Sequence, residues 1–322
     1  QLVVGTHALL SETVVFRDLG LVVADEQHRF GVAQRTKLTE KGRSPHLLVM
    51  SATPIPRTLA LIAYGDLDVS VIGELPPGRR PVETFLVSEA LRERLNGFIR
   101  RQCSEGHQVY VVCPAVEESE DGVLRSAEAW AQTLQQSVFP DLRVGLLHGK
   151  MKSAEKDAAL AAFSAGETDI LVATTVVEVG VDVPNATLMV IENAERFGLS
   201  QLHQLRGRVG RGSAQSYCVL VSGTKNEETK KRLQALCKTT DGFQIAEQDL
   251  ALRGPGDFFG SRQHGLPLLK VASLQMDLET LQDAQQAAAA VIQTADSLNA
   301  PELAPLKARV EALFTRQEVS LN

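Results

Sequence analysis

Two adjacent carboxylates, Asp25 and Glu26, follow the apolar run of residues 20–24 and open the tetrad Asp25-Glu26-Gln27-His28. Acids at the carboxyl end of a buried parallel strand suit a nucleotide-bound Mg²⁺ and an attacking water. We expect Asp25 to hold Mg²⁺ through its water shell and Glu26 to orient and deprotonate the attacking water. The alternative is that the two residues are solvated acids at the end of a strand.

A second polar block lies far along the chain and reads Gln204-Leu205-Arg206-Gly207-Arg208-Val209-Gly210-Arg211. Its three arginines within six residues suit a polyphosphate, and Arg208 and Arg211 offer planar donor forks for γ-phosphate oxygens. The alternative is a solvated basic helix face, which Gly207 and Gly210 disfavour because glycine weakens a helix. Together the two blocks predict hydrolysis of a nucleoside triphosphate between two lobes.

Hydroxyl side chains follow the next strand-like run, residues 46–50, in the triplet Ser51-Ala52-Thr53. In a motor protein, hydroxyls at this place can sense whether the carboxylate site is loaded. Ser51 and Thr53 can equally cap a helix that begins after them. The triplet alone does not decide between these two roles.

A further polar segment runs from Thr174 to Pro184, after the strand-like residues 169–174. Gly180 permits a close backbone approach, and Asp182 can accept hydrogen bonds from a ribose or from an arginine. This segment therefore predicts a second strand end at the nucleotide site.

The elements that must position these residues are short apolar strands that alternate with amphipathic helices. The apolar runs are mostly continuous, which is typical of strands buried on both faces of a parallel sheet. The expected strands are residues 20–24, 46–50, 109–113, 144–147, 169–174, 188–191 and 217–221. The expected helices between them are residues 89–102, 127–137 and 154–164. This alternation favours an α/β architecture with right-handed crossovers.

Composition limits the function classes further. The chain has 322 residues, of which 44% are hydrophobic and 22% charged, as in a globular protein. No apolar run reaches the roughly 18 residues of a membrane span, and no secretory segment opens the sequence, so we expect a cytoplasmic protein with no membrane partner. The four cysteines lack C-x-x-C spacing, which disfavours a metal or disulfide site. With a net charge of −6, any DNA contact must come from local arginines and lysines.

The polar blocks resemble, in order and spacing, the motor of superfamily 2 helicases and translocases. Residues 25–28 are similar to motif II, 51–53 to motif III, 174–184 to motif V and 204–211 to motif VI. The resemblance implies ATP and Mg²⁺ between two RecA-like lobes, with nucleic acid across the top. It assigns nucleotide contacts to Gln27, His28, Ser51, Thr53, Gly180, Asp182 and Gln204.

Longer segments resemble the RecG family of bacterial ATP-dependent translocases, which act on branched and double-stranded DNA. They are residues 25–32, 52–59, 64–68, 74–79 and 196–203. Two expected helices, residues 226–237 and 243–252, and the loop after them are similar to that family's translocation (TRG) motif. The resemblance implies DNA or translocation roles for Thr6, His7, Thr174, Arg232, Arg253 and Gln263. It further implies single-strand DNA-binding protein as a partner and a place at the nucleoid.

Plainer interpretations exist for the DNA residues. Arg232 lies next to two lysines and can be solvated with them, and Arg253 can be a favourable charge at a helix C-terminus. Thr6 and His7 can be ordinary polar groups at the end of a strand. The functional interpretation of all four depends on the family resemblance.

The expected architecture is α/β, with parallel sheets in two lobes. Three prolines and two glycines within residues 73–81 predict a linker. We expect an incomplete first RecA-like lobe (1–73), the linker (74–81), a second RecA-like lobe (82–223), a small helical-hairpin-plus-loop translocation motif (224–270) and a helical tail (271–322).

The sequence departs from the family in one respect. It contains no G-x-x-x-x-G-K-[ST] phosphate loop, and Gly149-Lys150 is followed by Met151. We therefore expect a C-terminal portion of a longer enzyme, without the wedge domain, that does not hydrolyse ATP alone. The alternatives are a translocase like the transcription-repair coupling factor and a non-hydrolysing DNA-binding module. The acidic and arginine blocks disfavour the module, because it would need neither.

Overall fold

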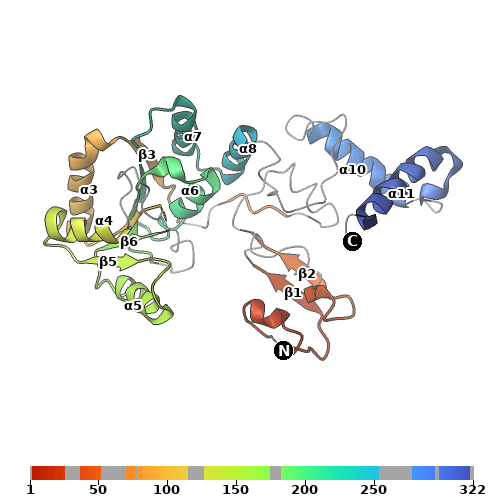
Figure 1. The fold of residues 1–322 in the computed structure, drawn as a ribbon, viewed down its shortest axis with the longest axis horizontal. Coiled ribbons are helices and arrows are strands. Elements are labelled where there is room, and N and C mark those ends of the chain that lie inside the picture. Colours follow the sequence, from red (N-terminus) through yellow and green to blue (C-terminus); the bar gives the residue numbers. More distant parts are fainter. Residues whose placement is uncertain are drawn as a thin grey trace.

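The computed structural model describes residues 2–25, 37–51, 68, 70–74, 76, 78–114, 127–174, 183–253, 278–293 and 297–319. Within these ranges the strands form two sheets, and every strand pair in them is parallel. Figure 1 shows the smaller sheet as a unit apart from the larger one. The predicted α/β fold with parallel sheets is confirmed. None of the helices in these ranges combines the length and apolar character needed to cross a membrane.

The smaller sheet consists of β1 (Leu21–Ala24) and β2 (His46–Val49). The two strands pair in parallel from Leu21 with His46 to Ala24 with Val49. Val22 and Ala24 are buried, so one face of β1 is covered while the other is exposed. The parallel register brings the carboxyl ends of both strands to one edge.

The larger sheet has six strands in the order β3-β8-β7-β4-β6-β5. Their bounds are β3 Glu83–Val87, β4 Gln108–Val112, β5 Val144–Leu147, β6 Ile170–Ala173, β7 Ala186–Ile191 and β8 Tyr217–Val221. Strands β4, β6 and β7 are buried at every residue, as the continuous apolar runs predicted. Strand β3 was not predicted. It is an edge strand whose exposure alternates, and its Glu83 and Thr84 interrupt the apolar pattern.

Helices cover this sheet and continue beyond it. Their bounds are α3 Arg92–Ser104, α4 Ala127–Thr133, α5 Ser153–Ser164, α6 Leu199–Arg206, α7 Glu227–Lys238, α8 Gly242–Arg253, α10 Leu278–Gln293 and α11 Ala304–Val319. Shorter helical turns are η1 His7–Leu10, η3 Glu89–Leu91, η4 Leu134–Val138, η6 Ala194–Arg196, η7 Ser297–Asn299 and η8 Pro301–Leu303. Figure 1 shows α10 and α11 as a helical pair away from the six-stranded sheet.

Two apolar layers hold the larger sheet between helices. On one face, α3 and α4 bury Leu95, Ile99 and Trp130 against the sheet. On the other face, α5 and α6 bury Phe163 and Leu202, α7 packs against β3 and α6, and α8 packs against α6 and α7. Each fully buried apolar side chain contributes about 1.5–3 kcal/mol. The result is an α/β/α sandwich that holds the strand ends in fixed positions.

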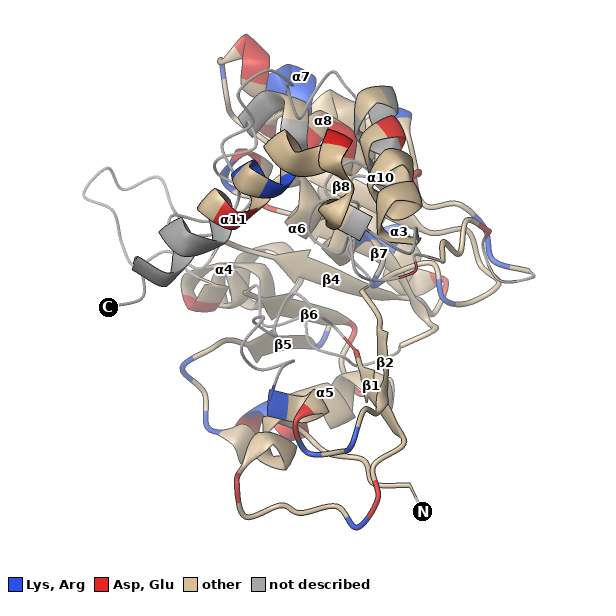
Figure 2. Ribbon diagram, turned by 90° about the vertical axis from the view of Figure 1, so that its right-hand side faces the viewer, with Lys and Arg blue, Asp and Glu red and all other residues tan. Residues whose placement is uncertain are grey.

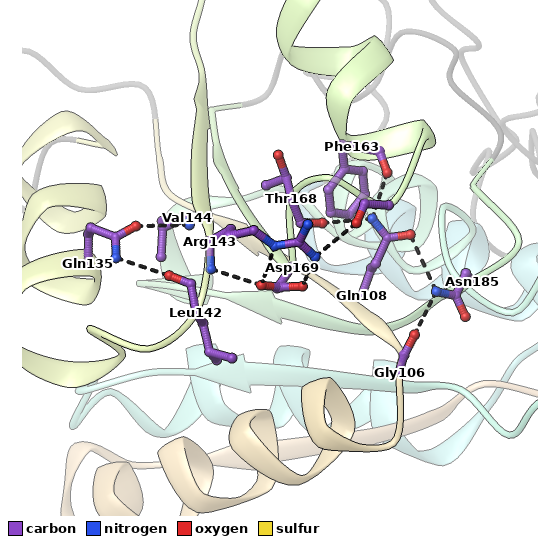
Figure 3. A network of polar contacts seen from close by, with 11 residues as sticks. Gly106, Gln108, Gln135, Leu142, Arg143, Val144, Phe163, Thr168, Asp169 and Asn185 are labelled. Atoms are coloured by element: carbon purple, nitrogen blue, oxygen red, sulfur yellow. Dashed lines mark hydrogen bonds and ion pairs between the residues drawn. The ribbon is translucent and has the colours of Figure 1, made fainter.

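A polar network ties the loops at the amino end of the larger sheet (Figure 3). The buried Gln108 amide donates to the carbonyl oxygens of Phe163 at 2.6 Å and Thr168 at 2.8 Å. Asn185 Nδ2 donates to Gly106 O at 2.8 Å, and Arg143 pairs with Asp169 at 2.6 Å. The bond from Gln108 to Phe163 O is buried and satisfies a carbonyl oxygen that water does not reach, while the contacts of Asn185 and Arg143 lie at the surface. The amino edge is thus a structural edge, and the polar segments of interest follow the carboxyl edge.

Candidate nucleotide and DNA site

Thr174 marks the carboxyl edge of the six-stranded sheet. Backbone bonds align the strand ends there: Cys113 N donates to Ala173 O at 2.8 Å and Glu192 N to Val112 O at 2.8 Å. Thr174 N donates to Leu147 O at 3.1 Å, and its side chain is partly exposed. The predicted position of Thr174 at a strand end is therefore observed. Gly180 and Asp182 lie outside the described residues.

The arginine turn, which we define as residues 207–211, begins where α6 ends at Arg206. Gln204 lies in the last turn of α6, so it precedes the arginine turn on the same rigid element. Arg208 N donates to Leu205 O at 3.0 Å, and Arg211 Nε donates to Gly207 O at 3.3 Å. Arg208 is partly exposed and Arg211 exposed. Both guanidinium groups thus leave one short, hydrogen-bonded turn.

Gly210 is required at its place in the arginine turn by its backbone and by its surroundings. Its φ of +76° lies in the left-handed region, and a Cβ there would be 2.7 Å from Val82 Cγ2. Gly207, in contrast, has a helical φ of −68°. The sequence argument that glycine disfavours a plain helix therefore holds for Gly210 and not for the conformation of Gly207.

The segment just after the arginine turn touches the end of the run that starts at Thr174. A Cβ on Gly212 would lie 2.6 Å from Pro184 O, so the two backbones approach each other closely. The end of the predicted nucleotide segment 174–184 therefore lies against the residue that follows the segment 204–211.

Arg79 is a site residue that the sequence did not reveal. Its Nε donates to Gly210 O at 2.8 Å, across 131 residues of sequence. Nearby, Gln215 Nε2 donates to Pro81 O at 3.0 Å. The end of the predicted linker is thereby fastened to the arginine turn. Within a segment dominated by prolines and glycines, no spacing pattern distinguished Arg79 from a solvated residue.

Arg206 corrects the prediction that three arginines of the block suit a polyphosphate. Its side chain is 4% exposed and points into the protein, away from the turn that bears Arg208 and Arg211. The reason is helical geometry, because Leu199, Leu202 and Arg206 follow one another at the three- and four-residue spacing of a single helix face. That spacing was the available signal. Two arginines of the block, not three, remain for a phosphate.

Buried Arg206 bonds three carbonyl oxygens at the junction of α7 and α8 and one imidazole nitrogen on its own helix, α6. They are Leu236 O at 2.9 Å, Thr239 O at 2.9 Å, Thr240 O at 3.3 Å and His203 Nδ1 at 2.9 Å. Burial, and after it the positive charge of Arg206, lower the pKa of His203 to about 4. Asp241 acts in the opposite direction. A neutral imidazole is the form that can accept a hydrogen bond from Arg206.

Asp25 follows β1 at the edge where β2 also ends. Met50 N donates to Ala24 O at 2.8 Å, which places Asp25 and Ser51 at neighbouring strand ends. The Asp25 side chain is exposed. A carboxylate in water suits the outer shell of Mg²⁺, which keeps several of its waters. Glu26, Gln27, His28 and Thr53 lie outside the described residues.

Thr6 and His7 lie at the start of the helical turn η1 and not at a strand end. Thr6 Oγ1 accepts a hydrogen bond from Ala8 N at 3.4 Å and caps this turn. Lys41 Nζ holds the following loop through Ser11 O at 2.7 Å and Val14 O at 2.8 Å. The side chains of Thr6 and His7 are exposed, so they are accessible to a partner.

Arg232 lies on α7 and is held by the protein. Its guanidinium donates to Glu195 O at 2.7 Å in the turn η6, which contradicts the alternative of a merely solvated side chain. Figure 2 shows acidic and basic residues together on α7, where Glu227 begins the helix and Lys230 follows one turn later. Arg253 is the last residue of α8, and Gln263 lies outside the described residues.

Two protein families match separate parts of the chain. The helicase conserved C-terminal domain matches residues 89–213, which include strands β4, β5, β6 and β7 and the arginine turn. The family described as ATP-dependent DNA helicase RecG, domain 3, C-terminal, matches residues 239–319. The first match covers the predicted motifs V and VI, and the second covers α8, α10 and α11.

Known RecG proteins match most of the chain. The ATP-dependent DNA helicase RecG of Synechocystis is 59% identical over 287 residues, which are 89% of this chain and 34% of that protein. The RecG of Bacillus subtilis is 50% identical over 307 residues, or 95% of this chain and 45% of that protein. The structure of RecG bound to a three-way DNA junction covers 87% of this chain and 36% of that one, with a TM-score of 0.67 and 50% identity. The chain thus spans between about a third and a half of the relatives' length.

Proposed function

Because this chain belongs to the RecG family of ATP-dependent DNA helicases, we propose that it forms the C-terminal motor part of an enzyme that hydrolyses ATP to move on branched double-stranded DNA. In this role the six-stranded lobe closes over a nucleotide and the helical pair α7–α8 responds to it. The known RecG that was solved on a three-way DNA junction supports branched DNA as the substrate.

The observation that supports the proposal most strongly is the fixed backbone of the arginine turn. Arg79 holds Gly210 from one side, and the close approach of Gly212 to Pro184 limits the turn on the other. Catalysis of phosphoryl transfer is mainly positioning and electrostatics. Guanidinium groups that leave a rigid turn are suited to it, because little reorganisation is needed when charge develops on the γ-phosphate.

The proposed roles divide between the two sheets. Arg208 and Arg211 bind the γ-phosphate oxygens, and Asp25 holds Mg²⁺ through water. Mg²⁺, when bound, neutralises charge on the phosphates. Glu26 orients and deprotonates the attacking water, and Ser51 reports the state of the carboxylate site. The remaining proposed nucleotide contacts are Gln27, His28, Thr53, Gly180, Asp182 and Gln204.

DNA contact is proposed for residues outside the nucleotide site. In this proposal Thr6, His7 and Thr174 contact DNA, and Arg232, Arg253 and Gln263 couple turnover to movement. The chain carries a net charge of −6, so these local contacts must supply the attraction. Single-strand DNA-binding protein is a proposed partner, and the bacterial cytoplasm at the nucleoid is the proposed location.

A chimeric enzyme tests this function directly. The matching C-terminal residues of Bacillus subtilis RecG would be replaced by this chain, which is 50% identical to them. We expect the chimera to hydrolyse ATP and a three-way DNA junction to stimulate the rate. A Glu26→Gln chimera should bind the junction without turnover, since it lacks the group that activates water.

The outcomes separate the alternatives. A folded chimera that binds junction DNA without ATP turnover would favour the non-hydrolysing DNA-binding module. Stimulation by linear duplex equal to that by the junction would favour a translocase like the transcription-repair coupling factor. Stimulation by the junction that is lost in Glu26→Gln is the result that the proposal predicts.

A further inference from the structure

Arg206 is a buried cation whose partners in the described structure are neutral. Its four hydrogen bonds go to three carbonyl oxygens and one imidazole nitrogen. Two of the carbonyls, those of Leu236 and Thr239, belong to the last turn and the C-cap of α7. The C-terminal end of a helix carries a partial negative charge of about half an elementary charge. The end of α7 therefore compensates the buried guanidinium.

Stability alone does not account for an arginine at this position. The neighbours on the same face of α6, Leu199, Leu202 and Leu205, are fully buried apolar residues. Replacing a buried charged group by a well-packed apolar side chain is often neutral or stabilising. An arginine, unlike a leucine, fixes the orientation of the neighbouring elements, because its planar guanidinium bonds several acceptors at once. The acceptors here join α6 to the end of α7 and to the loop before α8.

Further contacts fasten α7 and α8 to the segment that contains α6. Arg232 donates to Glu195 O at 2.7 Å just before α6. Ser200 Oγ lies 3.2 Å from Asp249 Oδ2 and links the start of α6 to α8. Leu233 and Leu236 of α7 are buried in the same apolar cluster as α6. Of these tethers, Arg206 lies nearest in sequence to the arginine turn.

We propose that Arg206 is a positioning residue that locks the helical pair α7–α8 to the helix bearing the arginine turn, so that α6, α7 and α8 move as one body. The lock itself follows from the contacts and needs no ligand. Its use rests on the proposed function: a displacement of the arginine turn by ATP would be passed to the helical pair through Arg206. Arg206 would then join nucleotide state to movement without touching nucleotide or DNA.

Hydrogen exchange on the full 322-residue chain tests the lock. In Arg206→Gln, amides of residues 233–241 should exchange at least about tenfold faster, because charged hydrogen bonds that hold this end of α7 are lost. Amides of β4 and β7 should keep their rates. Arg100→Gln is the matched control, since Arg100 is an exposed arginine on α3 of the same lobe.

Two results would overturn the proposal. Unchanged exchange in residues 233–241 would mean that the other tethers suffice. Equal loss of protection in β4 and β7 would mean that Arg206 only supports the fold. Arg206→Lys guards against the second case, because it keeps the charge but replaces the fork by a single ammonium. In Arg206→Lys we expect amides of residues 233–241 to keep an intermediate protection from exchange. Full protection would show that the positive charge, and not the shape of the guanidinium, holds α7.

The pKa of His203 gives a readout that a general loss of packing would not mimic. It is about 4 in the chain, held down first by burial and then by the charge of Arg206. In Arg206→Gln it should rise, because the positive neighbour is gone while Asp241 remains, and NMR of the imidazole measures it. An unchanged pKa would contradict the contact. Neither measurement needs ATP or DNA, so failure here would leave the proposed function standing.

Discussion

Replacing Gly210 by alanine should destabilise the six-stranded lobe through two separate effects. The φ of Gly210 is +76°, and a left-handed backbone costs a non-glycine residue about 1–2 kcal/mol. The added Cβ would also be 2.7 Å from Val82 Cγ2, and overpacking of this kind costs about 1–3 kcal/mol. Valine cannot turn away easily, since its χ1 is stiff. The expected loss of unfolding free energy is about 3 kcal/mol, which lies within the summed range of about 2–5 kcal/mol.

Urea denaturation followed by tryptophan fluorescence measures this loss. The chain has one tryptophan, Trp130, which is buried in the same lobe at 4% exposure and therefore reports on it. With a urea slope of about 2 kcal/mol/M, the midpoint of Gly210→Ala should fall by about 1.5 M. Two variants separate the two effects. Gly166→Ala shares a φ of +75° but has no described heavy atom within 4 Å of the new Cβ.

Gly166→Ala should therefore lose about 1 kcal/mol, the backbone effect alone. The second variant places Gly210→Ala in a Val82→Ala background, where the clashing methyl group is absent. There the additional loss should also fall to about 1 kcal/mol. The reasoning is refuted if Gly210→Ala is no worse than Gly166→Ala, or if its effect is the same with and without Val82→Ala.

Two further perturbations test neighbouring contacts in the same assay. Arg79→Ala should lower the unfolding free energy by about 1 kcal/mol through the lost bond to Gly210 O, whereas exposed Arg80→Ala should change it by less than about 0.5 kcal/mol; equal effects would contradict the assigned contact. The pKa of His203 is about 4 in the folded chain and about 6.5 in the unfolded chain. As the pH falls, the unfolded state therefore binds the proton first. The folding stability that is present above pH 6.5 is lost as the pH falls toward 4. The full change in unfolding free energy from this linkage is about 3 kcal/mol, and His203→Gln should remove it. An unchanged dependence of stability on pH would mean that other groups cause the loss at low pH.

Much of the fold could be predicted because burial on both sheet faces leaves a plain sequence signal. The apolar run 188–191 falls within β7, and the runs 144–147 and 217–221 coincide with β5 and β8. Strand β3 escaped because an edge strand has one partner and tolerates Glu83 and Thr84. Its place beside β8, far along the chain, depends on tertiary pairing that no local pattern contains.

The site was predictable in its residue types and less so in its directions. Arg208 is partly exposed and Arg211 is exposed, whereas Arg206 is buried and bonds the end of α7. A count of charges cannot separate them, although the spacing from Leu199 and Leu202 could have done so. Arg79 could not have been found, because its bond joins residues 131 positions apart.

The central claim is that the arginine turn acts on the γ-phosphate, and the kcat of the RecG chimera with junction DNA tests it most directly. Arg211→Ala should lower kcat by at least about 10³-fold, as the loss of an arginine that stabilises a phosphoryl transition state does. Junction binding should persist, and Arg100→Gln should retain the parent rate. A kcat for Arg211→Ala within about threefold of the parent, in a chimera that folds and binds DNA, would contradict the account, since removing a group with a transition-state role costs far more.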